Sequence, residues 1–434
     1  MNGKILKKRY YQITFRLMSP LAIGSGESVR ADKDVICDAQ GVPYIPASAI
    51  AGVTRNALTG ILKEKEIQQY YGDVEIATTA GQETNASESR LVFYDGVLKN
   101  REFHISVRDS VSLDAYKTAK DGAKFDMEVL EPGAEFVTLL EQGFFSEQDE
   151  VVSNLIAGLF HDGKVRFGAK SMRGYGETGR ALVRMAEFDL TSDTGVEAWL
   201  QFDPFREDAW NGKAECTFSS GEEAREGILS LSLKQCGGIS VRKYTTKVST
   251  GNKPQPDMEQ LTVRFGREEK PTIPGTSWAG AFRHRMGELG LEREEDEVLF
   301  GFVRGEGKNG KQRSRIRFSE TVIDKAHEKV LSRTAINRFD GGVKNGALFT
   351  EKTYYDGELT LNIGLDKKDR PGDGTLSILA AAVTDLHYGF LAIGGETSIG
   401  RGLFEITSVN GKRVEDGTDI YTLVLDTLRE VMCA

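Results

Sequence analysis

One sequence pattern occurs twice in this chain and constrains its fold more than any other feature. The segment "YIPASAIAGVTR" around Pro46 returns as "TIPGTSWAGAFR" around Pro274, 228 positions later. Four more segments return in the same order at separations of 224 to 226 positions: "SRLVFYD", "AKDGAKFDMEVLEPG", "FHDGKVRFG" and "GYG". Matches that stay collinear at a nearly constant offset indicate an internal repeat. A chain of 434 residues also suits two domains of about 200 residues each.

Each copy is predicted to contain the same order of elements. Alternating apolar residues around Ile13 and Leu231 predict a first strand, and the two prolines are suited to begin a helix. Hairpin-like strands, a second amphipathic helix, a glycine-rich turn and a last strand follow. This is the order of the ferredoxin-like fold. We therefore predict an α+β protein with two ferredoxin-like (RRM-like, βαββαβ) domains in tandem, over residues 1–190 and 226–434, with a linker or packing arm over 191–225.

The composition is that of a soluble globular protein, with 39% hydrophobic and 28% charged residues. The chain has no apolar run of the roughly 18 residues that a membrane helix needs, and its first residues hold no apolar signal core, so we expect a cytoplasmic protein without a membrane partner. The four scattered cysteines indicate reduced thiols rather than a zinc site. A net charge of −9 counts against a uniformly basic nucleic-acid coat but leaves room for local basic stretches, such as 241–253 and 304–318.

The two helix starts are candidate phosphate contacts. Hydroxyl side chains lie beside the N–H groups that a helix start leaves unpaired, and an arginine follows about two to three turns along the same helix. Simple capping with a surface arginine is the alternative, and the recurrence of the motif favours phosphate contact. The side chains concerned are Ser48 and Arg55 in the first copy and Thr276, Ser277 and Arg283 in the second.

The glycine-rich turns are further candidates. "FGAKSMRGYGETG" carries Lys170, Arg173 and Tyr175, whereas "IGGETSIGRG" keeps the glycines but only Arg401 as a basic residue. Glycines let the backbone approach a phosphate closely, and basic side chains add charge. A purely structural turn explains the second copy nearly as well.

Two long hairpins carry large apolar residues among lysines and asparagines. An apolar wedge on such an arm can unstack a base, and core packing is the equal alternative. The residues are Phe125 and Met127 within 117–129, and Leu348 and Phe349 within 334–353.

An acidic loop before the first helix is the strongest catalytic candidate. It contains Asp32, Asp34 and Asp38, and Asp32 lies 14 residues before Pro46. A carboxylate beside bound phosphates could hold a divalent metal that polarises a phosphodiester. In the second copy the same spacing falls on Gln260, and the nearest carboxylates are Glu259 and Asp257, the latter 17 residues before its proline, so that loop is longer or its acid is displaced. The alternative is an ordinary solvated loop.

Taken together, the segments "FRLMSPLAIGSGE", "YIPASAIAG" and "FGAKSMRGYGE", with their second copies, resemble the RAMP superfamily, and more closely the backbone subunits of type III CRISPR effector complexes. The resemblance covers nearly the whole chain outside 190–225. It implies two ferredoxin-like palms, each with a thumb β-hairpin, here at about 108–133 and 333–357.

The resemblance also implies partners and chemistry. The partners are a CRISPR guide RNA, a complementary target RNA and the other subunits of a type III complex, namely the large subunit, small subunits and other RAMP subunits. Target-cleaving members cut RNA with a loop aspartate and a divalent metal, Mg²⁺ or Mn²⁺. That aspartate stands three residues before a valine, as Asp32 does before Val35, with Asp34 as the nearby alternative. By this resemblance, the catalytic and metal-binding residues are Asp32 and, despite its departing spacing, Asp257.

Three hypotheses follow. The first is an RNA-guided, metal-dependent endoribonuclease subunit, and the second is a passive double backbone subunit that only holds guide and target. The third is a metal-free, guide-processing nuclease of the same superfamily, which usually relies on histidine or tyrosine. The placement of the five histidines argues against the third.

Overall fold

The computed structural model describes residues 4–26, 31–59, 61–75, 85–113, 119–146, 149–219, 226–243, 256–266, 268–304 and 310–433. Residues 244–253 and 305–309 of the two basic stretches lie outside this part, as do 220–225 of the predicted arm. Contacts divide the chain into two units. The first comprises Met1–Ser106, Glu128–Ala169 and Gly176–Glu222, and the second comprises Val107–Met127, Lys170–Tyr175 and Glu223–Ala434.

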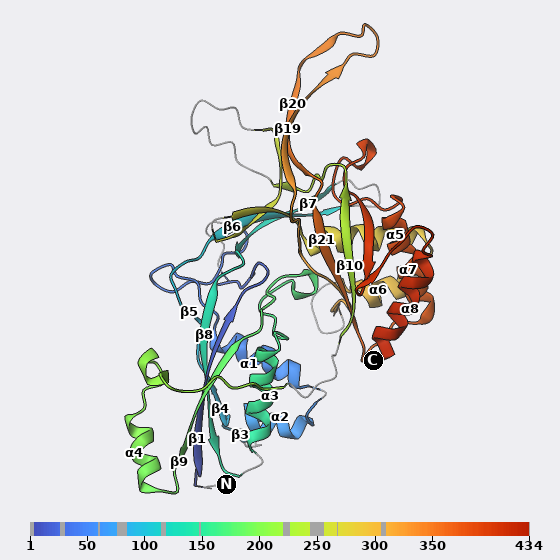
Figure 1. Ribbon diagram of the computed structural model, residues 1–434. Helices are drawn as coiled ribbons and strands as arrows, with labels where there is room; N and C mark the ends of the chain where they lie inside the picture. The colour runs from blue at the N-terminus through green and yellow to red at the C-terminus, as the bar shows by residue number, and fades with distance from the viewer. Residues whose placement is uncertain are drawn as a thin grey trace, which may run out of the picture. The chain divides into compact units, whose positions relative to one another are not determined.

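The first unit is built on an antiparallel sheet with the order β4-β8-β1-β9. Its strands are β1 (Lys7–Arg16), β4 (Leu91–Phe93), β8 (Glu135–Phe144) and β9 (Leu182–Asp189), and β5 (Val97–Leu98) also pairs with β8. Helices α1 (Ala47–Leu58) and α3 (Glu150–His161) pack on the face that carries Tyr11, Ile13 and Phe15 (Figure 1). The two middle strands are the first and third of the βαββαβ order, so the predicted ferredoxin-like fold is confirmed.

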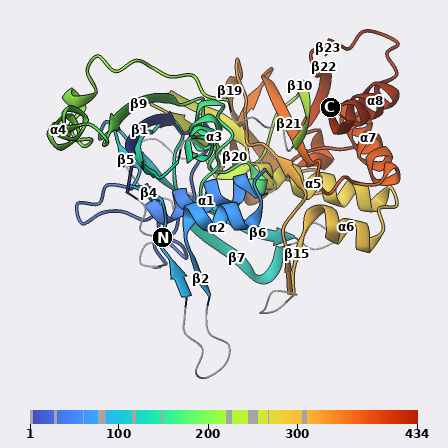
Figure 2. The ribbon, with the colours of Figure 1, turned by 90° about the horizontal axis from the view of Figure 1, so that it is seen from below.

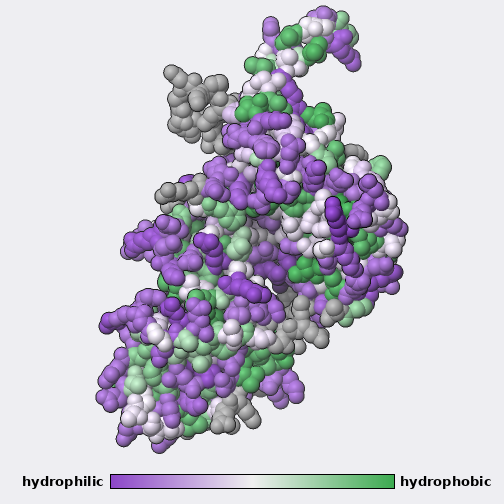
Figure 3. Space-filling view, in the orientation of Figure 1, coloured by the Kyte–Doolittle hydropathy of each residue, from purple (hydrophilic) through white to green (hydrophobic). Residues whose placement is uncertain are grey.

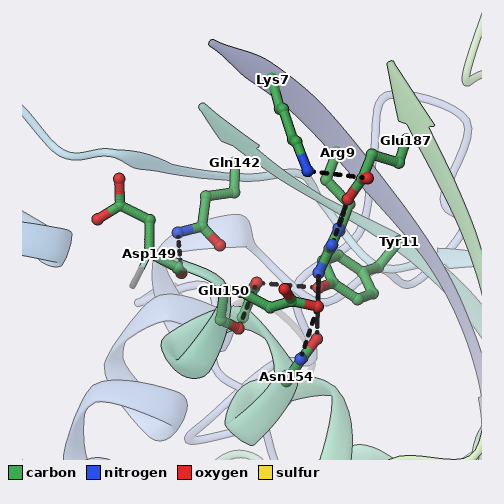
Figure 4. Close-up of polar contacts among 9 residues, drawn as sticks. Lys7, Arg9, Tyr11, Gln142, Asp149, Glu150, Asn154 and Glu187 are labelled. Atoms are coloured by element: carbon green, nitrogen blue, oxygen red, sulfur yellow. Dashed lines mark hydrogen bonds and ion pairs between the residues drawn. The ribbon is translucent and has the colours of Figure 1, made fainter. Parts of the chain in front are cut away.

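A buried arginine ties α3 to this sheet. Arg9 lies on β1 and donates from Nε to Glu187 on β9 at 2.8 Å and from Nη1 to Glu150 on α3 at 3.0 Å (Figure 4). Burial by itself would lower the pKa of the Arg9 guanidinium, but Tyr11 and Glu187 outweigh it and raise the pKa above its ordinary value. The charge is therefore held in place by partners from three elements.

The second unit repeats the same sheet with the order β17-β21-β10-β22-β23. Its strands are β10 (Glu226–Cys236), β17 (Ile316–Phe318), β21 (Glu358–Asp366), β22 (Leu403–Val409) and β23 (Lys412–Arg413). Helices α5 (Gly275–Glu288) and α7 (Asp373–His387) are the counterparts of α1 and α3, and their apolar residues share one core with Leu229, Leu231 and Leu233. A further helix, α8 (Ile420–Cys433), lies beside α7 and joins that core (Figure 2).

Additional short elements complete both units. Each copy has a small second helix after its first one, α2 (Glu64–Tyr71) and α6 (Arg293–Phe300). The other strands are short and are β2 (Asp73–Glu75), β3 (Asn85–Ser87), β11 (Arg242–Lys243), β12 (Met258–Gln260), β13 (Thr262–Phe265), β14 (Glu268–Ile273), β15 (Phe302–Val303), β16 (Lys311–Gln312) and β18 (Thr321–Val322). No helix within the described residues is long and apolar enough to cross a membrane.

Both thumb hairpins predicted from the sequence are present. The first is β6 (Ile105–Leu113) with β7 (Ala119–Leu130), and the second is β19 (His327–Ile336) with β20 (Val343–Tyr355). The end of the second hairpin carries solvent-exposed apolar side chains among polar ones (Figure 3). These side chains are those of Ile336, Phe339, Val343 and Leu348, whereas Phe349 is half-buried.

The first hairpin differs from the expectation. Met127 is only 2% exposed, and Phe125 is half-buried with the Lys170 ammonium 4.6 Å from its ring centre. The prediction that Met127 is an exposed wedge is therefore wrong. Periodicity could not reveal this, because residues 107–127 of this hairpin belong to the second unit, so segments far away in the sequence set the surroundings of Met127.

The described part of the predicted linker is a packed arm on the first unit. It contains α4 (Asp193–Gln201), capped by the Ser192 hydroxyl, and a 3₁₀ turn over Glu207–Trp210. Trp210 is 1% exposed and packs with Tyr10 and Phe188, while the neighbouring residue Tyr11 faces the helices. The arm therefore covers the sheet face opposite α1 and α3.

We expect Trp210→Ala to lower the free energy of unfolding of the first unit by about 3–5 kcal/mol, because it leaves a cavity among buried aromatic rings. Leu200→Ala in the same arm is the control, since Leu200 is 72% exposed and its loss should cost less than about 0.5 kcal/mol. Urea unfolding followed by circular dichroism measures both. Equal stability of the two variants would contradict the packed arm.

Candidate nucleic-acid interface

The acidic loop of the first copy is held by contacts on both of its sides. Ser25 N–H donates to the Asp34 carbonyl at 3.1 Å, and Glu128 N–H on β7 donates to the Lys33 carbonyl at 2.9 Å. The Asp34 carboxylate accepts from Ala31 N–H at 2.9 Å and so shapes the loop itself. Asp32 comes just before the two residues, Lys33 and Asp34, whose carbonyls accept these backbone hydrogen bonds, and its side chain is exposed. This geometry favours Asp32 over Asp34 as the residue that meets a substrate.

The second copy places Asp257 at the position of Asp32. In the strand register, Glu259 on β12 lies opposite Lys243 on β11 and opposite Lys352 on β20. Lys352 is the repeat counterpart of Glu128. Glu259 therefore corresponds to Asp34, and Asp257, two residues earlier, corresponds to Asp32. The longer spacing to Pro274 arises after this ladder, because the hairpin of β13 and β14 is three residues longer than its counterpart in the first copy, where Cys37 pairs with Pro43. The acid itself is not displaced.

The environment of the two aspartates differs in one respect. The Asp257 carboxylate accepts from Thr350 N–H at 2.9 Å and from the Thr350 hydroxyl at 3.0 Å. The repeat counterpart of Thr350 in the first copy is Asp126, a carboxylate that cannot donate in its ionised form. Only the second copy therefore has this hydroxyl to fix the orientation of its loop aspartate.

The N-terminus of α1 and the N-terminus of α5 have different neighbours. At α1, Ala47 N–H donates to the Asp95 carboxylate at 2.7 Å, so a carboxylate already lies where a phosphate was predicted. At α5, the carbonyl of Arg173 lies so close to Gly275 that a Cβ there would overlap it. Ser48 and Thr276 are exposed and Ser277 is half-buried.

The helix arginines have acidic partners on the following helix. Arg55 lies 3.6 Å from Glu64 of α2, and Arg283 donates from Nε to Asp296 of α6 at 2.8 Å. The recurrence of this arginine therefore has a structural explanation in both copies. An RNA phosphate would have to compete with these ion pairs.

The two glycine-rich turns share one backbone conformation. Lys170 and Glu396 have φ of 58° and 57°, and Gly174 and Gly400 have φ of 79° and 80°. In the first turn, Lys170 donates to the Ser110 hydroxyl at 3.0 Å, and Arg173 donates to the carbonyls of Phe300 and Ile316. Burial and the nearby Arg283 guanidinium lower the pKa of Arg173 to about 10.

The side chains at the centre of the turns are buried. Tyr175 is 2% exposed, and Arg401, at the equivalent place, is 7% exposed and pairs with Glu351 at 2.8 Å and with the Tyr355 hydroxyl. Glu351 is in turn the counterpart of Met127. All three side chains are almost fully buried, which does not favour the predicted RNA contacts of Tyr175, Arg401 and Met127.

One basic hollow does combine several of the predicted features. It lies within the second unit and is lined by the first hairpin, the first glycine turn, β11 and the start of α5. Its polar lining comprises Arg108, Asp109, Ser110, Tyr175, Arg242, Lys243 and Thr276, with three basic side chains against one acidic one. Arg108 pairs with Glu320 at 2.5 and 3.2 Å, whereas Arg242 is exposed and Lys243 half-exposed. Arg242 and Lys243 were not singled out individually, although the basic stretch 241–253 contains them.

The candidate metal centre depends on few protein ligands. Among the residues that the structure describes, no group of three or more His, Cys, Asp or Glu side chains could hold a metal ion. A single exposed carboxylate such as Asp32 still fits Mg²⁺, which commonly binds one or two carboxylates together with phosphates and water. Such an ion would be completed by the RNA.

Comparison with known proteins gives one family. A family model described as the RAMP superfamily matches residues 14–178 and 243–405. A solved structure of the type III-B Cmr-beta complex bound to cognate target RNA is similar at 19% identity and a TM-score of 0.31, over 41% of this chain and 61% of that one. That likeness is too distant to carry an argument, and no curated protein matches the chain. Because the family model matches both copies and most of the sequence, this chain belongs to the RAMP superfamily.

Proposed function

We propose that this chain is a fused double backbone subunit of a type III CRISPR effector complex, which binds a CRISPR guide RNA and cleaves complementary target RNA. The observation that carries the proposal is the equivalent placement of Asp32 and Asp257 in two ferredoxin-like folds. In each copy the loop is bonded to a strand of the thumb hairpin. The partners would be the guide, the target, and the large, small and other RAMP subunits of the complex.

The basic hollow in the second unit supports RNA binding. Arg242, Lys243 and the Thr276 hydroxyl would contact phosphates there, beside the half-buried Lys170 and Phe125. A local basic site of this kind agrees with a net charge of −9, since only one face needs to meet RNA. Contacts of this type position a backbone and carry no sequence information, so sequence would be read by pairing between guide and target.

Cleavage would depend on the loop aspartates. A bound Mg²⁺ or Mn²⁺ would polarise the scissile phosphate and stabilise the leaving oxygen. Asp32 would supply the carboxylate for that ion, while Asp34 and Glu128 keep the loop in shape. In the second copy Asp257 would have the same role, oriented by Thr350.

A non-catalytic scaffold is the second candidate function. It is favoured by the absence of a metal-binding cluster among the described residues. In a scaffold, the contact between Asp257 and Thr350 would serve only to join β20 to the strand β12 beside it. The two candidates differ in whether the loop aspartates of this chain, and not another subunit of the complex, cut the bound target RNA.

We expect Asp32→Asn to remove one target-RNA cut and Asp257→Asn to remove another, because each amide loses the charge that holds the ion. The complex is assembled with guide RNA and incubated with labelled complementary RNA and Mg²⁺, and the cut positions are mapped. Asp34→Asn serves as the matched control and should keep both cuts, although weaker loop packing could slow the first. Cuts that persist unchanged in the double variant Asp32→Asn/Asp257→Asn would mean that another subunit cuts the RNA and that this chain is a scaffold.

We expect Arg242→Ala/Lys243→Ala to weaken guide-RNA binding to a similar degree for guides of different sequence. Loss of two phosphate contacts should also make the plot of log binding constant against log salt concentration less steep, by about 1–2 in the magnitude of its slope. Filter binding at several salt concentrations measures both quantities. Lys234→Ala, an exposed lysine on β10, is the control and should leave the slope unchanged. A sequence-dependent loss would argue for base contacts instead.

A further inference from the structure

The two glycine-rich turns have the same backbone but different surroundings. A Cβ built on Gly174 would overlap the backbone of Ser319 and Glu320, so the first turn is in tight contact with the segment that follows β17. At Gly400, the counterpart of Gly174, no atom of the described residues lies within 4 Å of such a Cβ. The first turn is thus docked on a ferredoxin-like fold, whereas the second is open, that is, not covered by any residue that the structure describes.

The docked turn is held by a defined set of contacts within the second unit. Arg173 donates to the carbonyls of Phe300 and Ile316 at 3.2 and 3.3 Å. Arg108 and Glu320 form an ion pair in which both side chains are almost fully buried. On the receiving side, Gly275 is a glycine at a point where a Cβ would overlap the Arg173 carbonyl. Buried ion pairs and close backbone approach make such a junction selective.

The second turn does not carry the side chains of this junction. Ile399 stands where the first turn has Arg173, and it is 55% exposed. Arg333, the counterpart of Arg108 at a separation of 225 positions, pairs with Glu351 and Glu396 of its own copy. The second turn therefore offers an apolar side chain in place of a guanidinium.

The first copy also lacks the receiving side of the junction. The counterpart of Gly275 is Ala47, whose Cβ would fill the space that a docked turn needs. The counterpart of Glu320 is Asp95, and its carboxylate already accepts from Ala47 N–H. A second molecule of this chain therefore cannot repeat the internal junction from its C-terminal copy to the next N-terminal copy.

We propose that the open turn, Thr397–Gly400, is a docking surface for a different RAMP chain and not for a second copy of this one. The partner fold is expected to have a glycine at the start of its first helix, to admit the backbone of the turn. It is also expected to have an apolar lining where Ile399 enters, in place of the carbonyls that bind Arg173. This inference rests on the proposed function for the presence of other RAMP subunits, and it makes the chain a non-repeating member of the assembly.

Photo-crosslinking tests the proposal. The full chain, with benzoylphenylalanine in place of Ile399, is co-expressed with guide RNA and the remaining subunits of a type III complex, and crosslinked peptides are identified by mass spectrometry. We expect a crosslink to another RAMP chain near its first helix. The same group in place of the exposed Leu200 is the control and should not reach that chain. Ile399→Asp should lower retention of the partner at least tenfold in native mass spectra, and Ile399→Leu should keep it.

Two results would overturn the inference while leaving the proposed function in place. One is a crosslink from position 399 to residues around 47 or 95 of a second copy of this chain. The other is an assembled complex in which position 399 reaches no protein. A chain that fails to enter any guide-RNA complex would instead remove the proposed function and the partner together. Because the readout is a protein contact, a loss of RNA cleavage does not alter it.

Discussion

Within the second unit, the contact of the turn Lys170–Tyr175 with the second ferredoxin-like fold is the one on which most of the functional geometry depends. Backbone meets backbone at Gly174 and Gly275, where side chains would not fit. The Arg173 guanidinium then donates hydrogen bonds to the carbonyls of Phe300 and Ile316 in place of water. These hydrogen bonds compensate for the cost of burying its charge. The basic hollow exists only because this contact brings the first hairpin, the turn, β11 and α5 to one place.

Duplication produced two similar folds, and later substitutions gave them different chemistry. The pair Met127 and Tyr175 in one copy corresponds to the buried ion pair of Glu351 and Arg401 in the other. Two buried charges need each other, because either one alone would remain without a counterion in a region that excludes water. In the second copy these positions are therefore coupled, because Glu351 on the hairpin pairs with Arg401 on the glycine turn.

The sequence predicted the fold of both copies correctly. The alternation around Ile13 and Leu231 and the prolines at two helix starts are local signals, and they led to the observed order of strands and helices. Individual site residues were harder to predict. Arg283 looked like a phosphate ligand, although Asp296 on the next helix binds it, and the hairpin of β13 and β14 made Asp257 look displaced. Pairing partners and insertions of this kind become visible only when distant segments are placed side by side.

By itself, the sequence determined that the chain is a tandem of two ferredoxin-like units with thumb hairpins, because periodicity, helix starts and repeat spacing depend on neighbouring residues. Only the tertiary structure decided that Asp32 and Asp257 are equivalent, and that Met127, Tyr175 and Arg401 are buried. It also decided that one glycine turn is docked and the other open. Burial and ladder register are set by segments far apart in the chain, so no local pattern contains them.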